Sequence, residues 1–408
     1  MGRSTPRLAI SADRNRSTLP VLFSVVILDL IGFGIVMLAL PFYAEALGAS
    51  ATLLGFILAA YAAAQFVCAP LWGKLSDRIG RRRVLLVSIA GMGLSLLWLG
   101  LADTIPAIFA ARVLGGAFAA NIGVASAYIA DVTDASERTR WMGVLGACFG
   151  VGFVLGPAIA ALLEPFGDSL LGNRAAALPL LVAAGLAGLN WIWAAFSLHE
   201  PTQHTPPEPE DASGRFSMLR DPPVRRLCTV WLLFSLAVTQ LEATFAFFMI
   251  TQFDADMLRV GFIFVGMAVL MGGIQGGGMK FLAERFGERA LVVAGAVLCG
   301  ISFVGIPFAG AIPALIAVLA LGAMGRAIVQ PSLMGLVASA SSERTRGLTM
   351  GTFQSAGSLA RVFGPALAGW FFDTSFALPF WFAAVLFMAV AWFSRTLPQR
   401  VVEDEAPA

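Results

Sequence analysis

Three charged side chains, Asp29, Arg112 and Glu242, stand alone inside long apolar runs of the sequence. A carboxyl group in such a place can bind and release a proton, and a guanidinium group can tune a neighbouring acid or hold an anion. Burying either charge is costly unless it is paired or hydrated. We therefore take these three residues as candidates for proton coupling.

The elements that hold these charges must be membrane helices. Of the 408 residues, 58% are hydrophobic and 13% are charged, whereas about a quarter are charged in soluble domains. A crossing helix needs about 20 apolar residues. We predict an all-α membrane protein with twelve transmembrane helices, at approximately residues 19–42, 52–72, 84–102, 105–131, 141–163, 176–198, 227–250, 258–279, 290–310, 313–339, 347–369 and 376–395.

The basic residues show which loops face the cytoplasm. If the N-terminus is inside, 22 of the 27 basic residues fall on that side, and the opposite loops hold only Arg174 and Arg259. Loops rich in Lys and Arg stay in the cytoplasm. We therefore predict a multi-pass protein of a bacterial-type inner (plasma) membrane, with both termini cytoplasmic.

The chain divides into two halves of six spans. A polar, Pro-rich stretch predicts a cytoplasmic linker at 199–226, between bundles at 1–198 and 227–408. The segment Glu137–Arg140 recurs as Glu343–Arg346, near an offset of 207. Parallel repeats of this kind are typical of transporters, with the substrate site near the midplane between them.

The loop after the second span reads Gly73-Lys74-Leu75-Ser76-Asp77-Arg78-Ile79-Gly80-Arg81-Arg82-Arg83 and resembles the signature of the major facilitator superfamily. Gly73 would let two helices approach closely, Gly80 would allow a tight turn, and Asp77 could sit against a helix N-terminus. The resemblance implies that Asp77 contacts the eleventh helix. The alternative is a basic anchor that only fixes the topology. The implied conformational latch consists of Gly73, Asp77, Arg78, Gly80 and Arg81.

Two further segments resemble motifs of the same family. Arg112, in Ala111–Gly116, resembles its intramembrane arginine motif and lies about 10 Å deep, although its side chain could instead extend to the outer surface. The fifth span resembles the antiporter motif, which accompanies proton-driven export; close packing alone is the alternative. The motif glycines and proline are Gly146, Gly150, Gly156 and Pro157.

Asp29 lies about 14 Å from the inner surface, within reach of Arg112 if their helices adjoin. Asp29 could gain and lose a proton during transport, with Arg112 favouring the charged form when it approaches, or the two could form a static ion pair. Glu242 is a second candidate proton or cation site, or else a packing partner of Arg326 or Arg361. We predict a substrate cavity lined by Phe33, Gln65, Asn121, Glu242 and Gln354.

The first half, from Leu28 through Pro157, most resembles the tetracycline efflux group of drug:proton antiporters. That group has an acid in its ninth span, which residues 291–308 of this chain lack. The resemblance therefore implies the carrier class but no particular substrate.

We expect a secondary active transporter that exports small amphipathic organic molecules or drugs by alternating access, in exchange for protons. An uptake carrier or facilitator for a metabolite or lipid is the alternative, and no large folded loop favours a receptor or scaffold. We expect no enzyme activity, no catalytic residue, no metal and no cofactor apart from the proton. The expected partners are a small-molecule substrate and the lipid bilayer, with no nucleic acid, and we expect a monomer.

Overall fold

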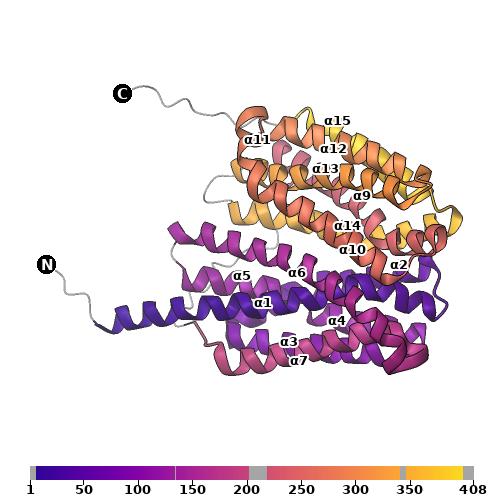
Figure 1. Ribbon diagram of the computed structural model, residues 1–408. Coiled ribbons are helices and arrows are strands. Elements are labelled where there is room, and N and C mark those ends of the chain that lie inside the picture. Colours follow the sequence, from indigo (N-terminus) through magenta and orange to yellow (C-terminus); the bar gives the residue numbers. More distant parts are fainter. Residues whose placement is uncertain (1–5, 134, 202–217, 341–345, 398–408) are drawn as a thin grey trace. The chain divides into compact units, whose positions relative to one another are not determined.

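The computed structural model describes residues 6–133, 135–201, 218–340 and 346–397, and every regular element in these ranges is a helix (Figure 1). Ten stretches are long and apolar enough to cross a membrane, and the helices α14 and α15 complete the predicted twelve. The predicted all-α fold is confirmed. Helices are the expected outcome, because a bilayer offers backbone groups no other hydrogen-bond partner.

The helices of the first half follow the predicted spans closely. They are α1 (Pro6–Ala46), α2 (Ala51–Ile79), α3 (Arg81–Leu101), α4 (Ile105–Phe118), α5 (Asn121–Val132), α6 (Ala135–Leu171), the 3₁₀ segment η1 (Gly172–Ala177) and α7 (Leu178–Ser197).

The second half also consists of helices joined by short connections. Its helices are α9 (Pro222–Phe253), α10 (Met257–Gly273), the π segment η2 (Ile274–Gly278), α11 (Met279–Phe286), α12 (Glu288–Gly305), the 3₁₀ segment η3 (Ile306–Phe308), α13 (Ile312–Ser339), α14 (Arg346–Thr374) and α15 (Leu378–Ser394).

The fourth and eighth predicted spans are both present, at Ile105–Val132 and Met257–Phe286, but neither is a single uninterrupted α-helix. The fourth span is divided into α4 and α5 by Ala119 and Ala120, although neither residue is a usual helix breaker. The eighth changes to a π-helix at Ile274–Gly278, where three consecutive glycines weaken the α-helical preference.

The first of two compact units contains residues 1–49, 60–208 and 249–265. In it α1 packs against α6 and α7, and α3 packs against α4 and α7. The backbones of α1 and α6 approach so closely that a Cβ on Gly156 would lie 2.6 Å from the Cα of Gly34. Buried Leu22 and Tyr128 belong to the main apolar cluster of this unit.

The second unit contains residues 50–59, 209–248 and 266–408. Here α12 packs against α13 and α15, and the rings of Trp231 and Phe353 stack with centroids 4.9 Å apart. A Cβ on Gly55 of α2 would lie 2.2 Å from the carbonyl oxygen of Pro365 in α14. Each unit therefore includes a segment from the other half of the sequence. The predicted boundaries at 198 and 227 stay a prediction, and residues 202–217 of the linker lie outside the described residues.

Candidate functional site

Asp29 lies on α1, where its carboxylate meets the first residue of α5. The Nδ2 atom of Asn121 donates a hydrogen bond to its Oδ1 at 2.7 Å. Asn121 is 5% exposed, and its Oδ1 has no hydrogen-bond partner among the described residues. Asn121 was predicted to line the substrate cavity, and the structure adds a contact with the candidate proton site.

Arg112 is buried on α4 but does not form an ion pair with Asp29 among the described residues. Its guanidinium carbon lies 3.9 Å from the ring centroid of Tyr61, a cation–π arrangement that stabilises a desolvated cation. The residue is 5% exposed, so its side chain does not extend to the surface. Tyr61 interacts electrostatically with both Arg112 and Asp29. In the first unit, Asp29 and Arg112 therefore both interact with Tyr61 but form no ion pair with each other among the described residues.

Two other predicted cavity residues lie in this unit. Gln65 donates to the carbonyl oxygen of Ala119 at 3.3 Å, at the point where α4 ends. Phe33 is exposed on α1, with its ring centroid 6.0 Å from that of Phe153 and 6.5 Å from that of Tyr61. An apolar ring and an amide therefore lie in the same unit as Asp29.

Glu242 and Arg326 form the corresponding acid–base pair of the second unit. The Nη2 atom of Arg326 on α13 lies 2.9 Å from Oε1 of Glu242 on α9, and the side chains are 24% and 33% exposed. This is the packing partnership that was one of the two alternatives for Glu242. Arg361 and Gln354 are both exposed on α14.

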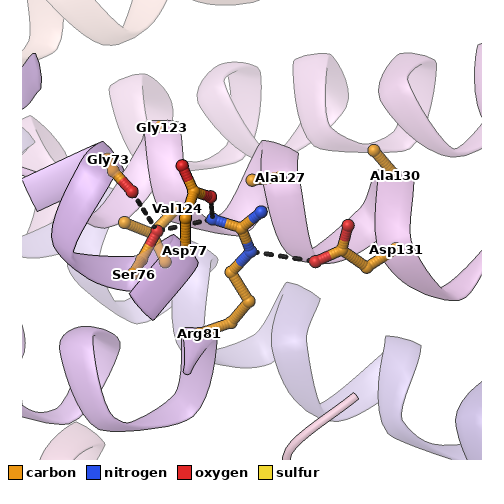
Figure 2. Close-up of a pocket in the computed structure, with 9 residues that line it drawn as sticks. All are labelled: Gly73, Ser76, Asp77, Arg81, Gly123, Val124, Ala127, Ala130 and Asp131. Atoms are coloured by element: carbon orange, nitrogen blue, oxygen red, sulfur yellow. Dashed lines mark hydrogen bonds and ion pairs between the residues drawn. The ribbon is translucent and has the colours of Figure 1, made fainter. Parts of the chain in front are cut away.

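The loop after α2 is organised around Arg81, which is 5% exposed (Figure 2). Its guanidinium donates to Asp77, to Oγ of Ser76 at 2.6 Å and to Asp131 at 2.9 Å. These residues line a cavity of about 350 Å³. The predicted contact of Asp77 with the eleventh helix stays a prediction.

The turn between α2 and α3 is formed by Gly80 and bound by the carboxylate of Glu200. Gly80 has φ +105°, as the predicted tight turn requires, and the carboxylate of Glu200 accepts hydrogen bonds from the backbone N–H groups of Arg81 and Arg82. The Arg82 guanidinium donates to two carbonyls near the end of α7, both at 2.6 Å. At Gly73 a Cβ would meet no described atom within 4 Å, and the predicted close approach of two helices there stays a prediction. Arg78, the remaining residue of the predicted latch, is exposed.

The glycines of the antiporter motif fall into two groups. Gly156, followed by Pro157, touches the backbone of α1, which explains the small residue by packing. A Cβ on Gly146 or Gly150 would meet nothing within 4 Å among the described residues. Packing therefore accounts for only part of this motif.

Two acids, Glu164 and Asp373, cap the N-termini of helices. Glu164, near the end of α6, accepts hydrogen bonds from the N–H groups of Met257 and Leu258, at 3.1 and 2.9 Å. Asp373, near the end of α14, accepts from those of Ala51 and Thr52, at 3.2 and 2.9 Å. Each acid thereby joins one half of the sequence to the first turn of a helix from the other half. The sequence offered a signal for these caps, because the two acids follow corresponding spans, the fifth and the eleventh.

Comparison with known proteins identifies the fold and the class. The family model described as Major Facilitator Superfamily matches residues 22–280 and 278–408. The chain is 31% identical over 366 residues to the class C tetracycline resistance protein of Escherichia coli, covering 87% of this chain and 89% of that protein. It is also 31% identical over 336 residues to the human major facilitator superfamily domain-containing protein 10, covering 77% and 72%.

Solved structures agree. The human organic anion transporter MFSD10 (TETRAN) matches with a TM-score of 0.67 and 27% identity, over 93% of this chain and 99% of that one. A bacterial homologue of the human lysosomal transporter Spinster, in an inward-facing and occupied conformation, matches with a TM-score of 0.77, 14% identity and 97% of both chains. The chain belongs to the Major Facilitator Superfamily and is a multi-pass membrane transporter.

Proposed function

We propose that this transporter exports small amphipathic organic molecules or drugs in exchange for protons that enter through Asp29. The observation that carries the proposal is the difference between its two acid–base sets. Glu242 is paired with Arg326 at 2.9 Å, whereas among the described residues Asp29 has one side-chain donor, the Asn121 amide, and Arg112 stacks on Tyr61.

An acid without a fixed counter-charge is suited to proton exchange. A carboxylate that is bound by arginine is held in its charged form, whereas one that is bound only by an amide can gain and lose a proton. Arg112 lies near the same ring and favours proton release when it approaches. Coupling then requires that substrate and proton favour different conformational states of the carrier.

The similarity to tetracycline resistance proteins supports export of drugs. The spacing of Gly146 and Gly150, which packing does not explain, supports the antiporter reading of the fifth span. The basic side of the protein would then face the cytoplasm, with protons entering from the opposite side. Both termini would lie in the cytoplasm.

The test is proton movement in inverted membrane vesicles on addition of each member of a drug panel that includes tetracycline. In the wild type, we expect an active compound to release protons from the acidified lumen, and Asp29→Asn to abolish this release. The matched control is Asp103→Asn, which removes a carboxylate that is 64% exposed and paired with Arg174. Equal proton movement in wild type and Asp29→Asn would refute the role of Asp29.

Uptake or facilitated passage of an organic anion is the second candidate. It is favoured by the similarity to a protein solved as an organic anion transporter and by the absence of a carboxylate partner for Arg112 among the described residues. Vesicles of opposite orientation separate the two functions. If an anionic dye accumulates in right-side-out vesicles without proton movement, the proposal of drug export is wrong and anion uptake is supported.

A further inference from the structure

The interruption between α4 and α5 lies beside the candidate proton site. Phe118 ends α4, Asn121 begins α5, and the two residues between them are not helical. A break inside the apolar layer frees backbone carbonyl groups, and leaving these without donors is costly. Such breaks persist only where other groups supply the missing hydrogen bonds.

Ser88 of α3 connects the two sides of this break. Its hydroxyl donates to the carbonyl oxygen of Phe118 and accepts from the N–H of Ala120 at 3.4 Å. Ser88 is fully buried. One hydroxyl therefore contacts the last residue of α4 and the residue that precedes α5.

Two side chains of α2 bind the neighbouring carbonyls. The indole N–H of Trp72 donates to the carbonyl oxygen of Ala117 at 2.6 Å, and Nε2 of Gln65 donates to that of Ala119 at 3.3 Å. Three consecutive carbonyls, at residues 117, 118 and 119, thus each accept a side-chain donor. Side chains of α2 and α3 therefore stabilise the break at these three acceptors.

The ring of Phe118 is also fixed in place. A Cβ on Gly91 would lie 2.2 Å from this ring, so only glycine leaves room for it on α3. On the other side, the rings of Trp72 and Phe118 have centroids 5.6 Å apart. Packing and hydrogen bonding therefore select the same backbone path.

This path determines where Asn121 lies. As the first residue of α5, Asn121 follows directly after the backbone that Ser88 holds, and its amide donates to Asp29 at 2.7 Å. An alternative path without the break would rotate residue 121 around the helix axis and remove the donor from the carboxylate.

We propose that Ser88, Trp72 and Gln65 are positioning residues of the proton site: they hold the break between α4 and α5 so that Asn121 donates to Asp29. This inference rests on the proposed role of Asp29 in proton exchange. It assigns a function in transport to Ser88 and Trp72, which touch neither the proton nor the substrate in the proposed mechanism, and a second function to Gln65, which is also a predicted cavity residue.

Few other groups compete with this hydrogen bond. Tyr61 of α2 interacts electrostatically with Asp29 and with Arg112, whose guanidinium lies over its ring. The elements α5 and η1, which also pack against α1, carry Tyr128, Asp131 and Arg174, and these contact His199, Arg81 and Asp103 respectively. Residues 141–163 of α6 and all of α7, which also pack against α1, contain no charged residue. A change in the Asn121 amide should therefore be visible in the pH dependence of transport.

The experiment measures drug-driven proton exchange against pH in purified protein that has been reconstituted into liposomes. Loss of a hydrogen bond to a charged group is expected to shift the pH of half-maximal exchange by about one pH unit in Asn121→Ala. We expect Ser88→Ala to shift it in the same direction, and Trp72→Phe, which keeps the ring and loses the N–H, to do likewise.

Ser95→Ala is the matched control. Ser95 is also buried on α3, and its hydroxyl donates to the carbonyl oxygen of Ala111 at 2.8 Å, inside intact α4. It should keep the wild-type pH profile. A purely structural role for Ser88 would lower the amount of protein or the maximal rate without moving the profile.

The outcomes separate this proposal from the one on which it rests. If Asp29→Asn still moves protons like the wild type, the proposed function fails. If exchange depends on Asp29 but Ser88→Ala and Trp72→Phe keep the profile of Ser95→Ala, the positioning role is wrong. Should Ser88→Ala not reach the membrane, Trp72→Phe decides the question alone.

Discussion

Replacing Asp373 by asparagine tests whether the carboxylate caps hold helix ends together on the side that the charge distribution places outside. The two oxygens of Asp373 accept hydrogen bonds from the first two N–H groups of α2, at 3.2 and 2.9 Å. Asparagine keeps one acceptor oxygen and loses the negative charge, which favours the positive end of the helix. The contact between α14 and α2 should weaken without any loss of volume.

The size of the effect follows from these two bonds. A hydrogen bond to a charged group contributes about 1.5–3 kcal/mol, and a neutral one about 0.5–1.5 kcal/mol. Asparagine loses one bond and converts the other from charged to neutral, but solvent at this helix end compensates in part. We expect a net loss of about 1–2 kcal/mol, which changes the ratio of joined to separated helix ends by a factor of about 5–30.

The assay is alkylation of a buried reporter cysteine by a membrane-impermeant maleimide in intact cells. Leu54→Cys places the reporter on α2 one turn from the cap, where Leu54 is fully buried. The four native cysteines are first replaced by alanine. We expect Asp373→Asn to raise the labelling rate about 5–30-fold, in proportion to the separated population.

The second cap provides an independent repeat. Glu164→Gln should raise the labelling of Val260→Cys, a buried reporter on α10, because Glu164 caps that helix. Asp103→Asn, which removes an acid that pairs with Arg174, is the control. If Asp373→Asn labels no faster than Asp103→Asn, the caps do not limit opening and the reasoning is refuted.

Two further results are expected from the glycines and the loop. Gly156→Ala should abolish transport or reduce the amount of folded protein in the membrane, because its Cβ would lie 2.6 Å from Gly34, whereas Gly150→Ala should be tolerated sterically. Fluorescence-detected size exclusion and drug transport into inverted vesicles distinguish the two variants. Equal behaviour would contradict the packing argument. Asp77→Asn should slow transport severalfold while the protein still reaches the membrane, because it removes the carboxylate that binds Arg81. An unchanged transport rate would mean that the loop serves only as a topological anchor.

Most of the fold could be predicted from composition, because each apolar run of sufficient length has one stable solution in a bilayer. The break at Ala119 and Ala120 could not. Alanine is the best helix former, so the local sequence argues for continuity, and the break depends on donors at Gln65, Trp72 and Ser88. Tertiary contacts overrode local propensity there.

The candidate site was predictable where a residue type is unusual in its surroundings. Asp29 and Arg112 were visible as lone charges in apolar runs, and Gly80 as a turn residue. Their contacts were not visible: Tyr61 carries no charge that marks it in the sequence, and Asn121, although predicted to line the cavity, was not predicted to bind Asp29. Proximity between helices is a property of packing, which a single sequence does not encode in its spacing.

The repeat makes the difference between the two acid–base sets informative. An acid lies on the first helix and an arginine on the fourth crossing of each half, namely Asp29 with Arg112 and Glu242 with Arg326. If both sets served only to stabilise the helices, both should be paired, because leaving opposite charges unpaired inside membrane helices is costly. Within the part of the chain that the structure describes, the second set is paired, at 2.9 Å, and the first is not: there Arg112 stacks on Tyr61, and Asn121 donates to Asp29. A stabilising role therefore suits Glu242, and the cost of keeping Asp29 apart from Arg112 is best explained by a carboxylate that must change its charge during transport.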